Sequence, residues 1–317
     1  MNNTTTQTTV SPTFDQRPAP ETVKIITIQI ISSNKQFFSE AMFETLLTIE
    51  PQPYSASSVY YALNKAPESA YQSLLGLYAL HRKWREAANY ADNHQAVTTL
   101  NWWHHELEAE PAKAIEHPAL RALYAADWSD KHAEALQMLL HGHMHWHHLN
   151  RVEDLAQLQP TIDAIGGEFA RLWLMLTNAP VSDELIQSAG RALWWVDHIR
   201  HIGHNLSNQR IWIPMQWLKE TDTPAHILLS TSPSQNRAQQ LKPLLEKLIA
   251  HTQSELANYQ TQYRALSKTQ QTSIRSWHTL MNLRADLLAV IVQDPAELFE
   301  GLVSIAPLRK WWRAVRS

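Results

Sequence analysis

Helical spacing of the apolar residues, with few residues to interrupt it, is the feature that most constrains this chain. Leu and Ala recur three and four positions apart through most of the 317 residues, which places them on one face of a helix. Only 7 glycines are present, and stretches that alternate apolar and polar residues, as strands do, are scarce. The pattern therefore predicts an all-α protein.

The predicted helices are separated by short breaks, most of them at a proline. These breaks lie at 66–67, 116–118, 150, 159–160, 179–180, 212–214, 221–224, 232–234 and 307. Because no Gly- or Ser-rich linker and no repeat divides this region, we expect one large helical bundle domain over residues 55–317.

The residues before this domain have a different composition. Residues 1–22 are rich in Thr, Asn, Gln and Pro, which predicts a disordered N-terminal arm. Residues 23–54 form an N-terminal extension, in which the β-branched run 23–31 is compatible with a short strand or a helix start. A helix is expected over residues 37–49, before Pro51 and Pro53.

Charge and composition exclude several classes of function. The net charge of −3 gives no global field toward nucleic acid, and the absence of cysteine excludes disulfides and thiolate chemistry. The N-terminus does not have the pattern of a signal peptide, and the run 23–31 is too short to span a bilayer. We expect a cytoplasmic protein, with any membrane contact peripheral to the inner membrane.

Two linked motifs carry a resemblance to a known family. Residues 57–63 read SSVYYAL and residues 77–82 read LYALHR, which resembles the opening of squalene and phytoene synthases, where S-x-x-Y-Y-A leads to L-Y-A-F-x-R. Further matches follow in order at 102–107, 117–123, 165–167, 210–214 and 306–312. Through this collinearity the chain is identified as a member of the squalene/phytoene synthase family, which implies the all-α isoprenoid (prenyl) synthase fold.

The resemblance also implies a magnesium site, formed by two aspartate motifs on facing helices. In the family these carboxylates hold Mg²⁺, a hard cation that requires oxygen ligands, against a prenyl diphosphate. The first motif, D-D-x-x-D, corresponds here to Arg85, Glu86 and Asn89. One acid therefore remains, and a cation and an amide replace the other two.

The second motif, D-x-x-E-D, has no acid left. Its positions correspond to His201, His204 and Asn205, and Asp197 one turn earlier is the nearest carboxylate. Neutral imidazoles do not replace the anionic oxygen ligands of Mg²⁺. We therefore interpret the chain as a divergent member that lacks the family's route to ionisation of a prenyl diphosphate.

Other family positions keep residues suited to a phosphate. The resemblance assigns ligand binding to the following residues: Arg82, Arg200, Arg210, Tyr60 and Tyr78. Guanidinium groups match phosphate oxygens geometrically, whereas surface salt bridges with helix carboxylates are an equally weighted alternative for these arginines.

Two histidine clusters raise the question of a transition metal. Asp197, His198, His201 and His204 are spaced so that several share one helical face, and imidazoles with a carboxylate bind Zn²⁺, Fe²⁺ or Mn²⁺. Polar residues left in a former metal cavity are the favoured alternative. The second cluster, residues 141–148, reads HGHMHWHH and is expected at a helix end or in a loop. We interpret it as a solvated, pH-sensitive turn, and adventitious binding of a transition metal is the alternative.

The C-terminal segment 308–316 combines adjacent tryptophans with four cations. This composition is typical of a segment at a lipid headgroup boundary. Packing of Trp311 and Trp312 on the core, with the cations in water, is the slightly favoured alternative.

Three hypotheses of function follow. The first is a catalytically degenerate family member, a pseudoenzyme that binds an isoprenoid-like ligand or acts as a scaffold for a protein partner. In this respect it resembles the mitochondrial complex I assembly factor branch. The second is an active, Mg²⁺-dependent head-to-head prenyltransferase whose rearranged metal site uses Glu86, Asp92 and Asp197. The third is a transition-metal enzyme centred on the histidines of the first cluster.

Overall fold

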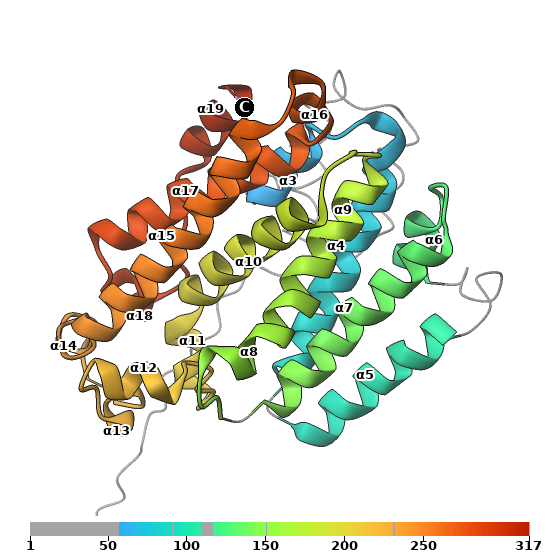
Figure 1. Ribbon diagram of the computed structural model, residues 1–317. Helices are drawn as coiled ribbons and strands as arrows, with labels where there is room; N and C mark the ends of the chain where they lie inside the picture. The colour runs from blue at the N-terminus through green and yellow to red at the C-terminus, as the bar shows by residue number, and fades with distance from the viewer. Residues whose placement is uncertain (1–56, 91, 109–116, 150, 231, 317) are drawn as a thin grey trace, which may run out of the picture. The chain divides into compact units, whose positions relative to one another are not determined.

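The computed structural model describes residues 57–90, 92–108, 117–149, 151–230 and 232–316, all within one compact unit. These residues form helices and connecting turns, and none of them lies in a strand. Figure 1 shows the long helices packed side by side. The predicted all-α fold is thus confirmed, whereas the predicted arm 1–22, the extension 23–54 and its two elements lie outside the described residues. The boundaries 55–317 stay a prediction.

The helices have the following bounds. The first half of the unit contains α3 (Ser58–Leu63), α4 (Glu68–Ala88), α5 (Asn93–Glu108), α6 (Pro118–Leu123), α7 (Asp130–His148), α8 (Leu155–Ile162), the π-helical turn η3 (Asp163–Gly167) and α9 (Glu168–Leu176). The second half contains α10 (Asp183–Arg200), α11 (Ile202–Ser207), α12 (Met215–Glu220), α13 (Ala225–Leu228), α14 (Ser234–Gln240), α15 (Lys242–Ala265), α16 (Lys268–Ser273), α17 (Arg275–Gln293), α18 (Glu297–Glu300) and α19 (Pro307–Arg316).

Local sequence signals explain most of these boundaries. Ser57 begins α3, because its Oγ accepts a hydrogen bond from the Tyr60 amide at 3.1 Å, as an N-cap residue does. Pro67 precedes α4 and Pro118 begins α6, where a missing N–H costs nothing. The break predicted at 159–160 is wrong: Pro160 lies inside α8, and the helix runs on through η3 into α9.

The core is built around tryptophan side chains and the central helix α10. The largest fully buried side chains include Trp84, Trp173, Trp195, Trp212 and Trp277, and burial of such rings from water dominates core energetics. Helix α10 packs against η3, α9, α15 and α17. The residues at its C-terminal end are therefore held between several neighbours.

A glycine contact sets the distance between η3 and α10. A Cβ atom placed on Gly190 would lie 2.4 Å from the carbonyl carbon of Gly166, closer than any side chain tolerates. Only glycine lets the two backbones approach this closely. This contact fixes α10 beside the helix that carries Gly166 and Phe169.

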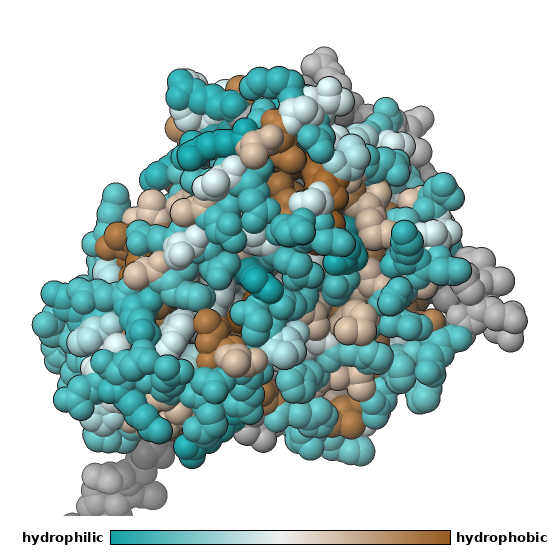
Figure 2. All heavy atoms as spheres, viewed as in Figure 1, coloured by the Kyte–Doolittle hydropathy of each residue, from teal (hydrophilic) through white to brown (hydrophobic). Residues whose placement is uncertain are grey.

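The face of the molecule in Figure 2 is mainly hydrophilic, with small separate hydrophobic areas. None of the helices in the described ranges is both long enough and apolar enough to cross a membrane.

Candidate functional site

A cleft opens among α4, α7, η3, α9, α10 and α11. Its inner part has a volume of about 230 Å³, and an adjoining outer part of about 270 Å³ extends toward α3, α17 and α19. The two parts share the following lining residues: His81, Arg85, Glu86, Phe169, Leu193, Asp197 and His201. We therefore treat them as one continuous cleft.

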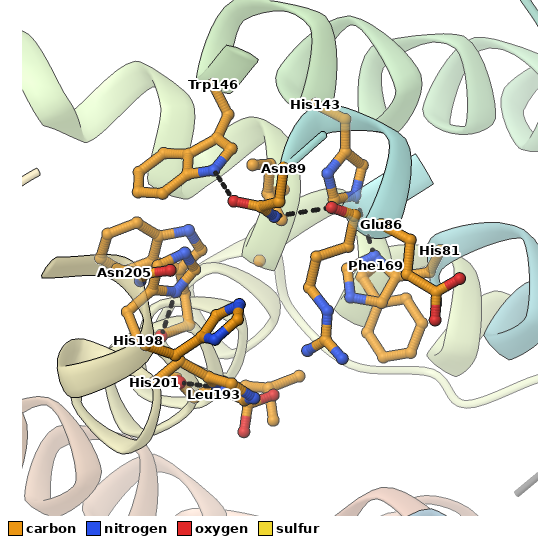
Figure 3. A pocket seen from close by; sticks show the side chains of 16 residues that line it. His81, Glu86, Asn89, His143, Trp146, Phe169, Leu193, His198, His201 and Asn205 are labelled. Carbon is orange, nitrogen blue, oxygen red and sulfur yellow. Dashed lines mark hydrogen bonds between the residues drawn. The ribbon is translucent and has the colours of Figure 1, made fainter. Parts of the chain in front are cut away.

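All six positions that correspond to the family's aspartate motifs line the inner part of this cleft. Helix α4 and its C-cap supply Arg85, Glu86 and Asn89. His201 lies between α10 and α11, and α11 itself supplies His204 and Asn205. In Figure 3, Glu86 and Asn89 lie on one side of the site, and His201 and Asn205 lie on the other. Spacings of three and four residues put each set on one helical face.

Arg85 is the charge that distinguishes this cleft from a metal site. It forms no ion pair with any carboxylate in the described part of the chain, yet it lies close enough to influence five titratable groups around the cavity. Together with burial, its charge lowers the pKa of His201 to about 4. A cation of this kind repels Mg²⁺ and attracts an anion.

The carboxylates in and near the cleft already have partners. Glu86 Oε1 accepts from Arg82 Nε at 3.0 Å, and Asp197 Oδ1 lies 2.7 Å from Arg284 Nε. Burial raises the pKa of Asp197, but Arg284, Arg85 and other cations outweigh it, so the pKa lies below its ordinary value. Asp92 does not line the cleft, because it is exposed and accepts from the amides of the first turn of α5.

These contacts contradict the rearranged magnesium site predicted from Glu86, Asp92 and Asp197. One of the three carboxylates lies outside the cleft, and each of the other two is paired with an arginine. A divalent cation would have to displace both arginines and tolerate Arg85 beside it. The residues present therefore do not fit Mg²⁺.

Asn89, at the third position of the first motif, links α4 to a cationic and aromatic neighbour. Its Oδ1 accepts from Arg210 Nη1 at 2.8 Å and lies 3.5 Å from Trp146 Nε1, as Figure 3 shows for the tryptophan. The guanidinium of Arg210 also lies 5.4 Å from the Trp146 ring centroid. Arg210 thus reaches the edge of the cleft through Asn89 and is not itself a lining residue.

Two histidines of the first cluster, His198 and His201, are held as neutral imidazoles. His198 Nδ1 lies 2.8 Å from the Trp194 carbonyl oxygen and His201 Nδ1 lies 2.6 Å from that of Asp197, so each Nδ1–H donates and each Nε2 has its lone pair free of a proton. Burial lowers the pKa of His198 to about 3, and its ring stacks on Trp194 at 3.6 Å.

The predicted transition-metal set is not assembled. Within the described ranges, no three His, Asp or Glu side chains come together in a group that could hold a metal ion. Asp197 is occupied by Arg284, and His204 Nε2 lies 3.1 Å from Asn208 Nδ2 on its own helix. His198 and His201 instead serve as neutral walls of the cleft.

The second histidine cluster corrects another prediction. Residues 141–148 do lie at a helix end, but they form the last two turns of α7 and not a solvated turn, since His143 is 1% exposed. Its Nε2 lies 3.1 Å from His81 Nδ1. Burial, and then the neighbouring His81 and Arg85, keep the pKa of His143 well below its ordinary value, so this histidine is a lining residue of the cleft.

The outer part of the cleft is strongly basic. The cationic residues that line it are Arg82, Arg85, Arg200, Arg284 and Lys310. Two carboxylates, Glu86 and Asp197, stand against them. Lys310 Nζ donates to Ser304 Oγ at 3.2 Å, and burial followed by the charges of Arg200 and Arg284 lowers its pKa. The excess of positive charge favours an anionic ligand.

Of the residues assigned to ligand binding from sequence, the cleft brings together Arg82, Arg200 and Tyr78. Arg200 Nε donates to the Val303 carbonyl oxygen at 2.6 Å, which fixes the guanidinium at the outer wall. Tyr60 does not line either part; its ring contacts Tyr61 edge-on at 5.5 Å.

Sequence reasoning did not select several lining residues. These include His81, Trp146, Phe169, Trp194 and Arg284. For His81 a signal was present, since it lies four residues before Arg85 and so on the same face of α4. Arg284 had no such signal, because it lies 87 positions from Asp197 in the sequence and contacts it only in the folded chain.

Comparison with known proteins agrees with the fold. Several solved structures resemble the chain. One is a dehydrosqualene synthase in complex with ligand (14% identity, covering 95% of this chain and 97% of that chain, TM-score 0.64). Two others are squalene synthase HpnC from Alicyclobacillus acidocaldarius (15% identity, 74% of this chain, 87% of that chain, TM-score 0.60) and YisP from Bacillus subtilis subsp. subtilis strain 168 (11% identity, 81% of this chain, 89% of that chain, TM-score 0.57). No curated protein matches the sequence. The family model described as squalene/phytoene synthase matches residues 53–312, and the chain therefore belongs to the squalene/phytoene synthase family.

Proposed function

We propose that this protein binds an isoprenoid diphosphate, or a lipidic anion of similar shape, in the cleft without ionising it. The observation that carries the proposal is Arg85, a cation free of carboxylate partners among the described residues, at a position where the family has a magnesium ligand. The protein is then a catalytically degenerate member of its family.

The two parts of the cleft suit the two parts of such a ligand. The outer part is lined by guanidinium groups of Arg82, Arg85 and Arg200, which match phosphate oxygens in charge and geometry. The inner part is lined by apolar and aromatic side chains, among them Phe169 and Trp194, which suit an isoprenoid chain. His198 and His201, which line the inner part, are neutral at pH 7, so its charged lining residues are the three that it shares with the outer part: Arg85, Glu86 and Asp197.

Loss of turnover follows from the same groups. In a metal-dependent synthase, Mg²⁺ neutralises the diphosphate as it leaves, and the donor set here does not fit Mg²⁺. Arginines hold a diphosphate in the ground state, but that alone does not lower the barrier to ionisation. An assembly or scaffold role, as the resemblance implied, is compatible with a ligand that is bound and not consumed.

The test is calorimetric titration of the protein with farnesyl diphosphate in the presence of EDTA. We expect binding in the wild type and a loss of about tenfold or more in affinity for Arg85→Gln, because a charge-assisted contact is removed. Arg151→Gln is the matched control, since this arginine is 65% exposed and pairs only with Glu153 nearby. No binding, or equal affinities of both variants and the wild type, would refute the proposal.

Turnover is measured in the same preparation. After incubation with farnesyl or geranylgeranyl diphosphate and Mg²⁺, with and without NADPH, we expect no hydrocarbon product by gas chromatography and mass spectrometry. Product at a useful rate would reject the degenerate interpretation, even if the ligand binds as expected.

A further inference from the structure

The C-terminal helix α19 presents its apolar face to solvent. Leu308, Trp311, Trp312 and Val315 are 75, 50, 51 and 50% exposed, and their spacing of three and four residues forms one continuous stripe. Lys310 and Ala314, between them, are buried. The packing of both tryptophans on the core, which the sequence slightly favoured, is therefore wrong: the stripe faces outward.

Polar contacts hold the helix in this orientation. Arg313 Nε donates to Asp286 Oδ2 on α17 at 2.8 Å, and Arg309 Nη2 lies 3.5 Å from Asp286 Oδ1. Burial raises the pKa of Asp286, but the two arginines lower it by more. The pKa therefore lies below its ordinary value, and the carboxylate stays ionised. The Tyr61 hydroxyl also donates to the Pro307 carbonyl oxygen at 3.3 Å. Figure 1 shows α19 beside α17 and α3 at this edge of the unit.

A basic pocket lies directly beside the stripe. It has a volume of about 230 Å³ and is lined by Asp286, Arg309, Trp312, Arg313 and Arg316. The guanidinium of Arg316 lies 4.0 Å from the Trp312 ring centroid, a cation–π contact that positions the charge next to the exposed ring. Three guanidinium groups against one carboxylate leave the pocket positive, which suits a phosphate group.

We propose that α19 is a docking surface for a bilayer that contains anionic phospholipid, with the tryptophans at the headgroup boundary and a lipid phosphate in the basic pocket. Amphipathic helices that combine Trp and Leu on one face with arginines around it bind in this way. Four side chains on a ten-residue helix fall well short of the roughly 800 Å² per partner that a stable protein interface buries. A membrane is therefore favoured over a second protein.

The position of α19 links this surface to the cleft. Lys310, on the inner face of α19, lines the outer part of the cleft together with Leu302 and Ile305, and Leu302 is 52% exposed. A protein docked through α19 thus has this wall of the cleft close to the bilayer, from which a lipidic ligand would arrive. Docking itself does not depend on what the cleft binds.

The test is flotation of the purified full chain with phosphatidylcholine vesicles that contain about one third phosphatidylglycerol, and with pure phosphatidylcholine vesicles. We expect the wild type to float with the anionic vesicles and much less with the neutral ones. The double variant Trp311→Ser/Trp312→Ser should lose about tenfold or more in partition coefficient, and Arg309→Gln/Arg316→Gln about fivefold per charge. Trp102→Ser is the matched control, since Trp102 is 47% exposed on α5, and it should float as the wild type does.

Several outcomes would overturn the proposal. The wild type could fail to float, or the double tryptophan variant could float as well as the wild type. The Trp102 control could also lose as much flotation as the double tryptophan variant. A concentration-dependent dimer in sedimentation that disappears in the double tryptophan variant, without vesicle binding, would assign the stripe to a second copy of the chain. The exchanged side chains are half-exposed, so each variant should fold as the wild type does. Unchanged thermal unfolding of each variant then excludes misfolding as the cause of weaker flotation.

Discussion

Removal of one partner of the ion pair between Arg284 and Asp197 is expected to cause one of the largest losses in the free energy of unfolding among the contacts of the cleft. Arg284 is 9% exposed in its side chain and Asp197 17%, with 2.7 Å between Nε and Oδ1. Arg284→Met removes the guanidinium, keeps most of the volume and leaves a buried carboxylate without its nearest cation. Removal of one partner from a buried pair typically costs about 3–5 kcal/mol.

The structure places this variant at the lower end of that range. Arg85 and Arg200 also lower the pKa of Asp197 and stay charged at pH 7, so part of the compensation remains after Arg284 is lost. We therefore expect a loss of about 3 kcal/mol in the free energy of unfolding at pH 7. At roughly 2–4 °C per kcal/mol for a domain of this size, the Tm should fall by about 6–12 °C.

Urea denaturation and calorimetry of three variants test this reasoning. Arg284→Met with Asp197→Asn should recover at least about 1 kcal/mol of the single variant's loss, because the stranded charge is gone. Arg82→Met is the control, since its partner Glu86 is 50% exposed and such pairs contribute below about 1 kcal/mol. If Arg284→Met costs no more than Arg82→Met, the ion pair does not have the role assigned to it.

Two further predictions concern the stability of the wall around the cleft. His198 and His201 have pKa values of about 3 and 4 in the folded chain, below the value near 6.5 that a histidine has in an unfolded chain. Between these values the unfolded chain binds more protons than the folded chain. The free energy of unfolding should therefore fall as the pH drops from about 6.5 toward 4, by up to about 1.4 kcal/mol per pH unit for each histidine. His198→Gln should make urea midpoints less sensitive to pH over that interval, and an unchanged slope would contradict the assignment. Gly190→Leu should cost at least about 3 kcal/mol or prevent folding, because its Cβ would meet the Gly166 backbone at 2.4 Å; near-normal Tm would show that η3 and α10 can separate.

The fold and the identity of the facing motif positions could be predicted from sequence. Helical spacing gave the class, and the collinear motifs indicated that Arg85 and Asn89 on one helix correspond to positions that face His201 and Asn205 on another. Both depend on local periodicity or on an ordered series of motifs, which a single sequence displays directly. In the structure these positions line one cleft.

Partner assignment could not be predicted, because it depends on side chains that approach from distant helices. Asp197 meets Arg284, and Asn89 meets Arg210 from 121 positions away. The solvated turn predicted at 141–148 is wrong for a different reason: the segment is helical, and its phase turns His143 and His147 inward. The packing predicted for Trp311 and Trp312 is also wrong, because α19 exposes a large apolar stripe, which is uncommon.

In the proposed function, guanidinium groups take the place of metal ions as the counter-charge for the ligand's diphosphate. This replacement is tested most directly by the ratio of the dissociation constants for farnesyl diphosphate measured in EDTA and in Mg²⁺. We expect binding in EDTA, a ratio near one and no product in either buffer. Binding that appears only with Mg²⁺, or a prenyl product formed in its presence, would contradict the proposed function.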